Sequence, residues 1–319
     1  MKKYIAFTLI LLLILSGCSP NKNQDSQNSD NKKQTIKIGY LPVTHSANLM
    51  MTEEIQQKSK KSGYKLELIR FNNWPDLMDA LNSGKIDGAS TLIELAMKSK
   101  QKGSDIKAVA LGHHEGNVIM GQKGKEASDF HNHGEYSFAI PHRYSTHYLL
   151  LEEMRKQMNL KSNTFSYHEM APAEMPAALS EKRISGYSVA EPFGALGEKL
   201  GKGDTIKHGS DIVPDAYCCA LVLRSDLIDQ HHTVAKAFMS DYKQAGYKMN
   251  NKEKSVDVMA KNFKQDRKVL EQSAEWTSYG DLTIKKDGYS KITDLVNDHN
   301  LFKAPAYKDF VDPTLYKEG

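Results

Sequence analysis

An internal repeat constrains the fold of this chain more than any other feature. Residues 42–55, "PVTHSANLMMTEEI", align without a gap with residues 141–154, "PHRYSTHYLLLEEM". A second gapless pair follows in the same order and at nearly the same offset, residues 76–90 with residues 174–188. Repeated segments in a fixed order indicate a duplicated structural unit. The chain is therefore predicted to contain two copies of one unit.

Each unit alternates strands with helices. The first has β-rich stretches at 35–41, 64–71 and 85–91, separated by helical patterns that begin at Ser46 and Trp74. The second unit repeats this order between residues 136 and 190. Alternating strands and helices predict α/β lobes, each a mainly parallel sheet flanked by helices. In such sheets ligands bind at the carboxyl ends of the strands, so we expect a ligand cleft between the two lobes.

The domain boundaries follow from this pattern. We expect lobe I at 35–118 and lobe II at 119–214. A last strand near residues 217–224 precedes a mostly helical tail without a sheet of its own, so residues 215–319 are expected to return and pack on lobe I.

The N-terminal region indicates export. Two lysines precede an apolar run that is shorter than the ~20 residues of a membrane span, which is typical of a signal peptide at 1–17. The tetrad Leu-Ser-Gly-Cys ending at Cys18 resembles a bacterial lipobox, which implies a lipid on Cys18 and an extracytoplasmic, membrane-anchored protein. Residues 18–34 are polar and predict a flexible tether. The Lys and Asn content of this tether suggests a Gram-positive bacterium.

Charge and cysteine content exclude several classes. The formal net charge is +4, and no basic block with interleaved aromatics occurs, so we expect no nucleic-acid partner. Besides Cys18 there are only Cys218 and Cys219. Adjacent cysteines rarely bridge each other because the spacing strains the disulfide, so we interpret them as half-buried thiols on a strand.

Two helix N-termini are candidates for binding an anion. They begin near Ser46 and Ser145, at equivalent places in the repeat, and Thr44 and Thr146 can add hydroxyl donors. Free backbone N–H groups and the helix dipole favour negative charge there. The alternative is ordinary N-capping by these serines.

Several motifs together resemble a known family. The lipobox, "GYLPVTHSANLM", "DLMDALNSGKIDGAS", "STHYLLLEEM" and "YSVAEPFGALGEKLGKG" are similar to the nitrate, sulfonate, taurine and bicarbonate group of ABC-importer solute-binding lipoproteins, relatives of the thiamine-precursor binders. The resemblance implies a two-lobed periplasmic-binding-protein-like fold of type II. It also implies a monomer that closes on a small anion or zwitterion and delivers it to an ABC permease with a separate ATPase subunit, without a cofactor.

The resemblance also implies which residues bind the ligand. They are His45, Ser46, Trp74, Ser90, Thr91, Ser145, Thr146, His147 and Glu191. Tyr217 and Asp215 are further candidates because they stand just before the last strand. Trp74 can instead be a core aromatic, and Glu191 a hydrogen-bonding group at the hinge. A carboxylate at Glu191 would repel a simple anion but accept an amine, which favours taurine or an alkanesulfonate over nitrate, bicarbonate or a thiamine-pyrimidine precursor.

Enzyme functions fit the sequence less well than a binding protein does. Ser145 and His147 stand two residues apart at a helix start, and no Gly-x-Ser-x-Gly elbow surrounds the serine. The pyrimidine-synthesising enzyme of the same fold has a cysteine-rich signature that is absent here. No Walker motif occurs. We therefore predict that the chain is not an enzyme.

A histidine-rich zinc-binding protein is the alternative of another class. His113, His114 and Glu115 form one cluster, and His131 and His133 form another. Such spacing in loops can chelate zinc, although the usual helical His-x-x-x-His is missing. The primary prediction assigns no metal ligand.

Overall fold

The computed structural model describes residues 33–318 apart from 60–61, and these residues form one compact unit. The expected signal peptide, Cys18 and nearly all of the tether lie outside the described residues. Within the described part of the chain, no helix has the length and apolar character needed to span a membrane.

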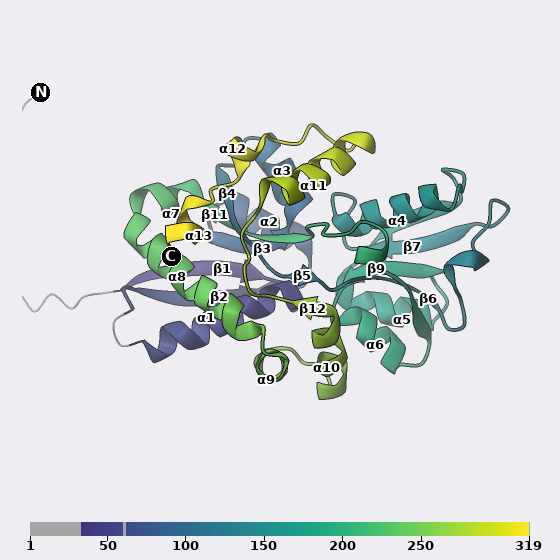
Figure 1. Ribbon diagram of the computed structural model, residues 1–319, viewed down its shortest axis with the longest axis horizontal. Coiled ribbons are helices and arrows are strands. Elements are labelled where there is room, and N and C mark those ends of the chain that lie inside the picture. The colour runs from purple at the N-terminus through teal and green to yellow at the C-terminus, as the bar shows by residue number, and fades with distance from the viewer. Residues whose placement is uncertain (1–32, 60–61, 319) are drawn as a thin grey trace, which may run out of the picture. The chain divides into compact units, whose positions relative to one another are not determined.

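Two five-stranded sheets form the centre of the fold (Figure 1). The first has the order β2-β1-β3-β11-β4 and the second the order β10-β6-β9-β7-β8. The strands of the first sheet are β1 (Gln34–Tyr40), β2 (Tyr64–Arg70), β3 (Gly88–Leu92), β4 (Ile106–Leu111) and β11 (Cys219–Arg224). Those of the second are β6 (Asn117–Gln122), β7 (Tyr136–Ile140), β8 (Phe165–Glu169), β9 (Gly186–Ala190) and β10 (Gly203–His208).

The sequence repeat corresponds to equivalent elements of the two sheets. The series β1, α1 (Ala47–Lys58), β2, α2 (Trp74–Asn82), β3 matches β7, α4 (Thr146–Gln157), β8, α5 (Met175–Ser180), β9. Read from β2 and from β8, the two sheets have the same strand order. This agrees with the predicted two-lobed α/β fold.

The sheets are mixed: in each, four strands run in the same direction, as the alternation of strands and helices predicted, and one runs against them. In the first sheet β1 is parallel to β2 and β3, but β11 is antiparallel to β3 and β4. In the second sheet β6 is likewise antiparallel to β9 and β10. Both β6 and β11 are the first strand after the chain has crossed from the other sheet. The chain enters at the edge where the parallel strands end, so it must run against them.

The chain crosses between the sheets twice, at residues 112–116 and 209–218. The first crossover contains β5 (His114–Glu115), which pairs with β12 (Thr277–Ser278) from the C-terminal region. The second begins with the 3-10 turn η4 (Gly209–Asp211). Both crossovers therefore run past the carboxyl ends of the parallel strands.

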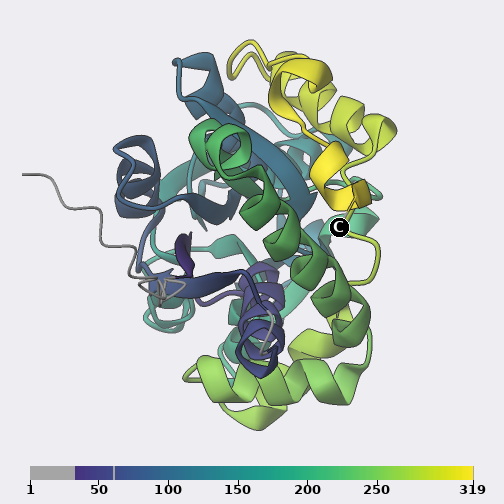
Figure 2. The same cartoon turned by 90° about the vertical axis from the view of Figure 1, so that its left-hand side faces the viewer.

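The C-terminal helices contact both halves of the fold. Helix α8 (His232–Met249) packs along α1, and α13 (Thr314–Glu318) contacts α8 and β4 (Figure 2). However, α10 (Arg267–Trp276) packs on α6 (Phe193–Lys199), and α11 (Lys286–Asp298) contacts α4. The other helices are α3 (Ile93–Gln101), α7 (Ser225–Gln230), α9 (Lys252–Asn262) and α12 (Tyr307–Phe310), with 3-10 turns η1 (Thr44–Ser46), η2 (Ala127–Asp129) and η3 (Pro172–Glu174).

The two equivalent serines differ in local role. Ser145 is the N-cap of α4: its Oγ accepts a hydrogen bond from the Tyr148 N–H at 3.2 Å and donates to the His142 carbonyl at 2.6 Å. Ser46 precedes α1, but its buried Oγ has no protein partner. Ser145 is therefore a capping residue in this structure, whereas the hydroxyl of Ser46 is available.

This difference predicts unequal effects on stability. Ser145→Ala removes a cap, so the free energy of unfolding should fall by about 1 kcal/mol. Ser46→Ala is the matched control, because it removes a hydroxyl that caps nothing, and it should cost clearly less. Urea denaturation of both variants followed by circular dichroism measures the effect. Equal losses would contradict the assigned capping role.

Candidate functional site

Metal-ligating side chains gather where the parallel strands end. His45 lies in η1 directly after β1, His113 follows β4, and His147 is the second residue of α4 after β7. Cys218 and Cys219 stand where β11 begins. All five side chains are buried. Because parallel strands end at one edge and the crossing strand begins there, residues distant in sequence meet at this place.

The distances define a compact cluster. The ligand atoms of His45, His113 and Cys219 all lie within 4.8 Å of one another. The Cys218 Sγ lies 3.1 Å from the Cys219 Sγ and 3.9 Å from the His147 Nε2. The donors thus come from the first sheet, from both crossovers and, through His147, from a helix of the second sheet. We call these five residues the His–Cys cluster.

Many polar atoms of this cluster have no protein partner. Both ring nitrogens of His45 and of His113 are buried and unpaired, as are the His147 Nδ1 and the indole Nε1 of Trp74. An unsatisfied buried donor or acceptor costs about 1–3 kcal/mol, and folded proteins pair most such groups. Such a concentration of buried, unpaired donors and acceptors is typical of a binding site.

The histidine and cysteine environments favour metal ligation. Burial, reinforced by the neighbouring His113, lowers the pKa of His45 to about 3, so its imidazole is neutral and can offer a lone pair. Burial alone would raise the pKa of the Cys218 thiol, but the hydrogen bond from Cys219 and the nearby His147 outweigh it and hold that pKa well below its ordinary value. Burial, together with the hydrogen bond to Cys218, raises the pKa of the Cys219 thiol. The two thiols thus influence each other's pKa in opposite directions.

A hydrogen-bonded chain beside the cluster connects α3 with α4. The Thr146 Oγ1 lies 2.5 Å from the Glu94 Oε1 and 2.7 Å from the Tyr217 carbonyl oxygen. Burial raises the pKa of Glu94 to about 8, so this carboxyl group is protonated at neutral pH. A protonated Glu94 can donate to Thr146, which leaves the single hydroxyl proton of Thr146 for Tyr217. The contact thus joins the two halves of the fold.

Other predicted site residues surround the cluster or support it. Trp74 is the first residue of α2, and its ring centroid lies 5.5 Å from that of His45, so it forms a wall of the site. The Ser90 hydroxyl contacts the His45 carbonyl at 3.4 Å, and the Thr91 hydroxyl contacts the Met78 sulfur at 3.5 Å. Both hydroxyls are therefore engaged by protein groups.

Glu191 serves the connection between the sheets. Its Oε2 accepts from the Ser273 hydroxyl at 2.8 Å and from the Ala195 N–H at 3.2 Å. Its backbone carbonyl accepts from the Thr44 N–H at 2.8 Å. Burial raises the pKa of Glu191 to about 7. The Oε2 of its carboxyl group is thus held by α6 and α10, whereas the buried Oε1 has no protein partner.

Tyr217 and Asp215 face the C-terminal region. The Tyr217 hydroxyl accepts from the Lys285 N–H at 3.1 Å. Asp215 is exposed and pairs with Lys291 at 3.4 Å. Of these two residues, only Tyr217 approaches the cluster, and it does so through the carbonyl that Thr146 contacts.

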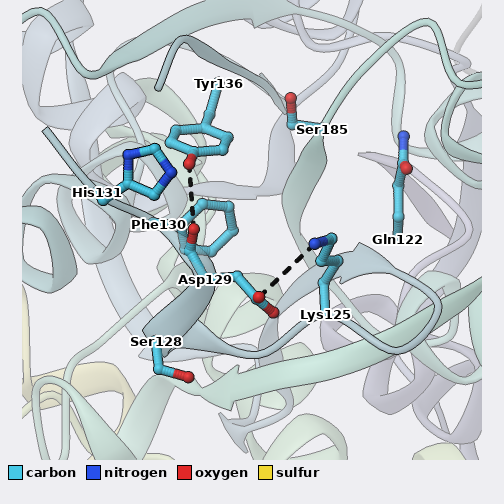
Figure 3. A pocket seen from close by; sticks show the side chains of 8 residues that line it. All are labelled: Gln122, Lys125, Ser128, Asp129, Phe130, His131, Tyr136 and Ser185. Atoms are coloured by element: carbon cyan, nitrogen blue, oxygen red, sulfur yellow. Dashed lines mark hydrogen bonds and ion pairs between the residues drawn. The ribbon is translucent and has the colours of Figure 1, made fainter. Parts of the chain in front are cut away.

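The two histidine-rich segments separate in space. His113 belongs to the cluster, but the His114 Nε2 lies 2.8 Å from the Asp281 carbonyl oxygen. His131 lines a different pocket of about 450 Å³, where Lys125 pairs with Asp129 at 3.6 Å (Figure 3). His133 is exposed. Among the described residues, only the cluster around His45 brings three such donors within ligand distance.

Sequence reasoning therefore missed part of the cluster. Cys218 and Cys219 were interpreted as half-buried strand thiols, His113 belonged only to the alternative, and Glu94 was not singled out. The position of these residues in the sequence was the available indication. They directly follow β3 and β4 or begin β11, at the edge where the parallel strands end.

Comparison with known proteins places the chain in a family. The profile of the NMT1-like family matches residues 29–262, most of the chain. The chain belongs to the NMT1-like family. A zinc-bound ligand-binding component of an ABC-type import system from Staphylococcus aureus is 71% identical, with a TM-score of 0.89 over 90% of this chain and 99% of that one.

More distant relatives agree on the fold. The periplasmic nitrate-binding protein of Synechocystis is 18% identical and has a TM-score of 0.79 over 90% of this chain and 88% of that one. A bicarbonate transport ATP-binding protein of Synechocystis is 23% identical over 57% of this chain and 30% of its own length. The chain thus spans under a third of that curated relative. The fold of the NMT1-like chain is that of periplasmic binding proteins.

The buried carboxyl group of Glu94 predicts a pH dependence of stability. Its pKa is about 8 in the folded chain, above the ordinary value of 4.5. Its contribution is complete below about pH 4.5 and is lost as the pH rises toward 8, by at most about 1.4 kcal/mol per unit. Glu94→Gln stays neutral, so its free energy of unfolding should decline less between pH 5 and 8.

Urea titrations at three pH values measure this slope. The exposed Glu67→Gln is the matched control and should keep the slope of the parent chain. A Glu94→Gln variant with the parental slope would show that Glu94 is ionised in the folded protein.

Proposed function

We propose that this protein is the solute-binding component of an ABC-type importer and that its solute is a transition-metal ion of the zinc class. One observation carries the proposal: the imidazoles of His45 and His113 and the thiol of Cys219 converge at a buried place between the two sheets, and the ring nitrogens of both histidines have no protein partner. Zinc takes four nitrogen or sulfur ligands, and thiolates with imidazoles select zinc or copper(I) over harder cations.

The geometry is close to what zinc requires. Bond lengths of about 2.0–2.1 Å to nitrogen and 2.3 Å to sulfur place tetrahedral ligand atoms about 3.3–3.8 Å apart. The atoms of His45, His113 and Cys219 lie within 4.8 Å of one another, so small side-chain rotations suffice. Cys218 or His147 supplies the fourth ligand. Three or four protein ligands would hold the ion as cargo.

The origin of the donors suggests how capture changes the shape of the protein. His45 and Cys219 belong to the first sheet, whereas His147 is carried by α4 of the second. An ion that contacts both groups stabilises the arrangement in which they meet, by its differential affinity for that state. The two crossovers would provide the hinge. The closed form would then dock on a permease whose ATPase is a separate subunit.

The zinc-bound relative supports this assignment. That Staphylococcus aureus protein is a ligand-binding component of an import system and is 71% identical to this chain over nearly its whole length. At this identity most residues around a buried site are expected to be shared. The proposal for this chain still rests on its own cluster.

An alkanesulfonate or taurine, or else nitrate, bicarbonate or a pyrimidine precursor, is the second candidate. The free hydroxyl of Ser46 at the start of α1 and the family relatives favour it. The charges of the buried residues favour this second candidate less than the zinc assignment. In the described part of the chain, Arg155 is the one buried Lys or Arg, and it is paired with Glu152. With His45 neutral, the anionic end of such a solute has no charged partner here, and the Oε2 of Glu191 is engaged by α6 and α10.

Calorimetry with zinc chloride tests the proposal. We expect one zinc ion per molecule, and a loss of affinity of at least about 100-fold (2.7 kcal/mol) in Cys219→Ser and in His113→Ala, because each removes a ligand. His131→Ala, in the separate pocket, is the matched control and should bind like the parent chain. Binding of taurine or nitrate without binding of zinc would overturn the metal assignment in favour of the second candidate.

We also propose that the chain is held at the membrane through a lipid on Cys18. The lipobox-like tetrad that ends at this residue supports the proposal. In cells fed a clickable palmitate analogue, the parent chain should be labelled and should sediment with membranes. The Cys18→Ala variant should be unlabelled and should not sediment with membranes. Cys218→Ala is the control and should remain labelled. Labelling that persists in Cys18→Ala would refute the anchor.

A further inference from the structure

The backbone holds the Cys218 and Cys219 thiols side by side. Adjacent residues of an extended strand point to opposite faces. Here β11 begins only at Cys219, so Cys218 still belongs to the crossover and turns its sulfur toward its neighbour, with 3.1 Å between the Sγ atoms. The Cys218 carbonyl accepts from the Ile93 N–H at 2.9 Å, and the Cys219 carbonyl from the Gly112 N–H at 3.0 Å. The juxtaposition is therefore fixed by the surrounding chain.

A bond between these sulfurs would be easy to form and easy to break. A disulfide requires about 2.05 Å, so the two sulfurs need to approach by roughly 1 Å. The Cα atoms of neighbouring residues are about 3.8 Å apart across a trans peptide, which is below the usual range of disulfides. Strain of this kind raises the reduction potential. Such a bond suits a reversible switch better than a structural crosslink.

We propose that Cys218 and Cys219 form a reversible oxidation site at which a hydroperoxide switches cargo binding off. This rests on the proposed function, because Cys219 is one of the expected zinc ligands. Cys218 and Cys219 are the only cysteines of the chain besides Cys18. The oxidation site therefore coincides with the cargo site.

The reaction balances with hydrogen peroxide as the oxidant. One sulfur attacks a peroxide oxygen, the O–O bond breaks, and the leaving hydroxide takes up the thiol proton to give water and a sulfenic acid. The second sulfur then attacks the sulfenic sulfur, the S–O bond breaks, and a second water leaves. Two thiols are oxidised to one disulfide, and one peroxide is reduced to two waters.

The consequence for cargo follows from the ligand chemistry. A thiolate binds zinc, but a disulfide sulfur carries no charge and is a poor ligand. Oxidation therefore leaves only the imidazoles of His45, His113 and His147. The two cysteines are 4% and 1% exposed and lie among the other expected ligands, so peroxide has to enter the cargo site to reach them. A bound ion should protect both sulfurs, which confines oxidation to the empty protein.

The test uses the full chain carrying Cys18→Ala, so that the two neighbouring thiols are the only ones. Hydrogen peroxide should remove two hydrogens from the peptide that contains both cysteines, measured by mass spectrometry. Zinc affinity, measured by calorimetry, should fall at least 100-fold. Dithiothreitol should restore both the two thiols and the zinc affinity. Protein loaded with zinc before the peroxide treatment should keep its thiols.

Cys218→Ala, again in the Cys18→Ala chain, is the matched variant. It removes one of the two sulfurs, so peroxide should produce no loss of two hydrogens from this peptide, whatever the variant's zinc affinity is. Oxidation to sulfinic acid without a disulfide, or a disulfide that leaves zinc affinity unchanged, would overturn the switch while the proposed cargo stands. A reduced parent chain that forms the disulfide but never binds zinc would instead overturn the proposed function, and the switch with it.

Discussion

The parallel strands of each sheet end at the same edge from which the chain departs for the other sheet. This constraint fixes the direction of β6 and β11, because a strand that starts at that edge must run antiparallel to its neighbours. It also decides which residues meet. The turn after β1, the crossover after β4 and the beginning of β11 come from distant parts of the sequence, and each delivers a ligating side chain to one place.

The His–Cys cluster is costly to the folded chain. Both ring nitrogens of His45 and of His113 are buried without protein partners, and the thiols of Cys218 and Cys219 are buried beside them. The protein offsets this cost through the cores on either side, where apolar residues of both sheets form one continuous cluster. Glu94 shows a different solution at the same edge, because it is protonated and meets Thr146 as a neutral group. The free-energy cost of burying polar groups without partners is thus concentrated at this cluster.

The repeat was sufficient to predict two equivalent α/β units, since it records the same order of strands and helices twice. It could not reveal the antiparallel strands, because β6 and β11 lie outside the repeated segments. Of the residues that the sequence singled out, His45, Trp74 and His147 lie at the ends of the parallel strands, whose positions the alternation pattern sets.

Other roles depended on side-chain directions that no pattern encodes. Ser46 and Ser145 occupy equivalent positions, yet only Ser145 caps its helix. Glu191 turns toward α6 and α10, and the thiols of Cys218 and Cys219 converge because β11 starts one residue after the first of them.

The short pairing of β5 with β12 has a mechanical meaning. It attaches the C-terminal region to the first crossover, while α10, just before β12, packs on α6 beside the second sheet. If the two crossovers were the only connections, the two sheets would be free to tilt relative to each other in several directions. The pairing adds a third connection between the two sheets, through β12 and α10, beside the two crossovers. Any change in the relative orientation of the sheets would therefore have to move α10 as well or break the pairing of β5 with β12.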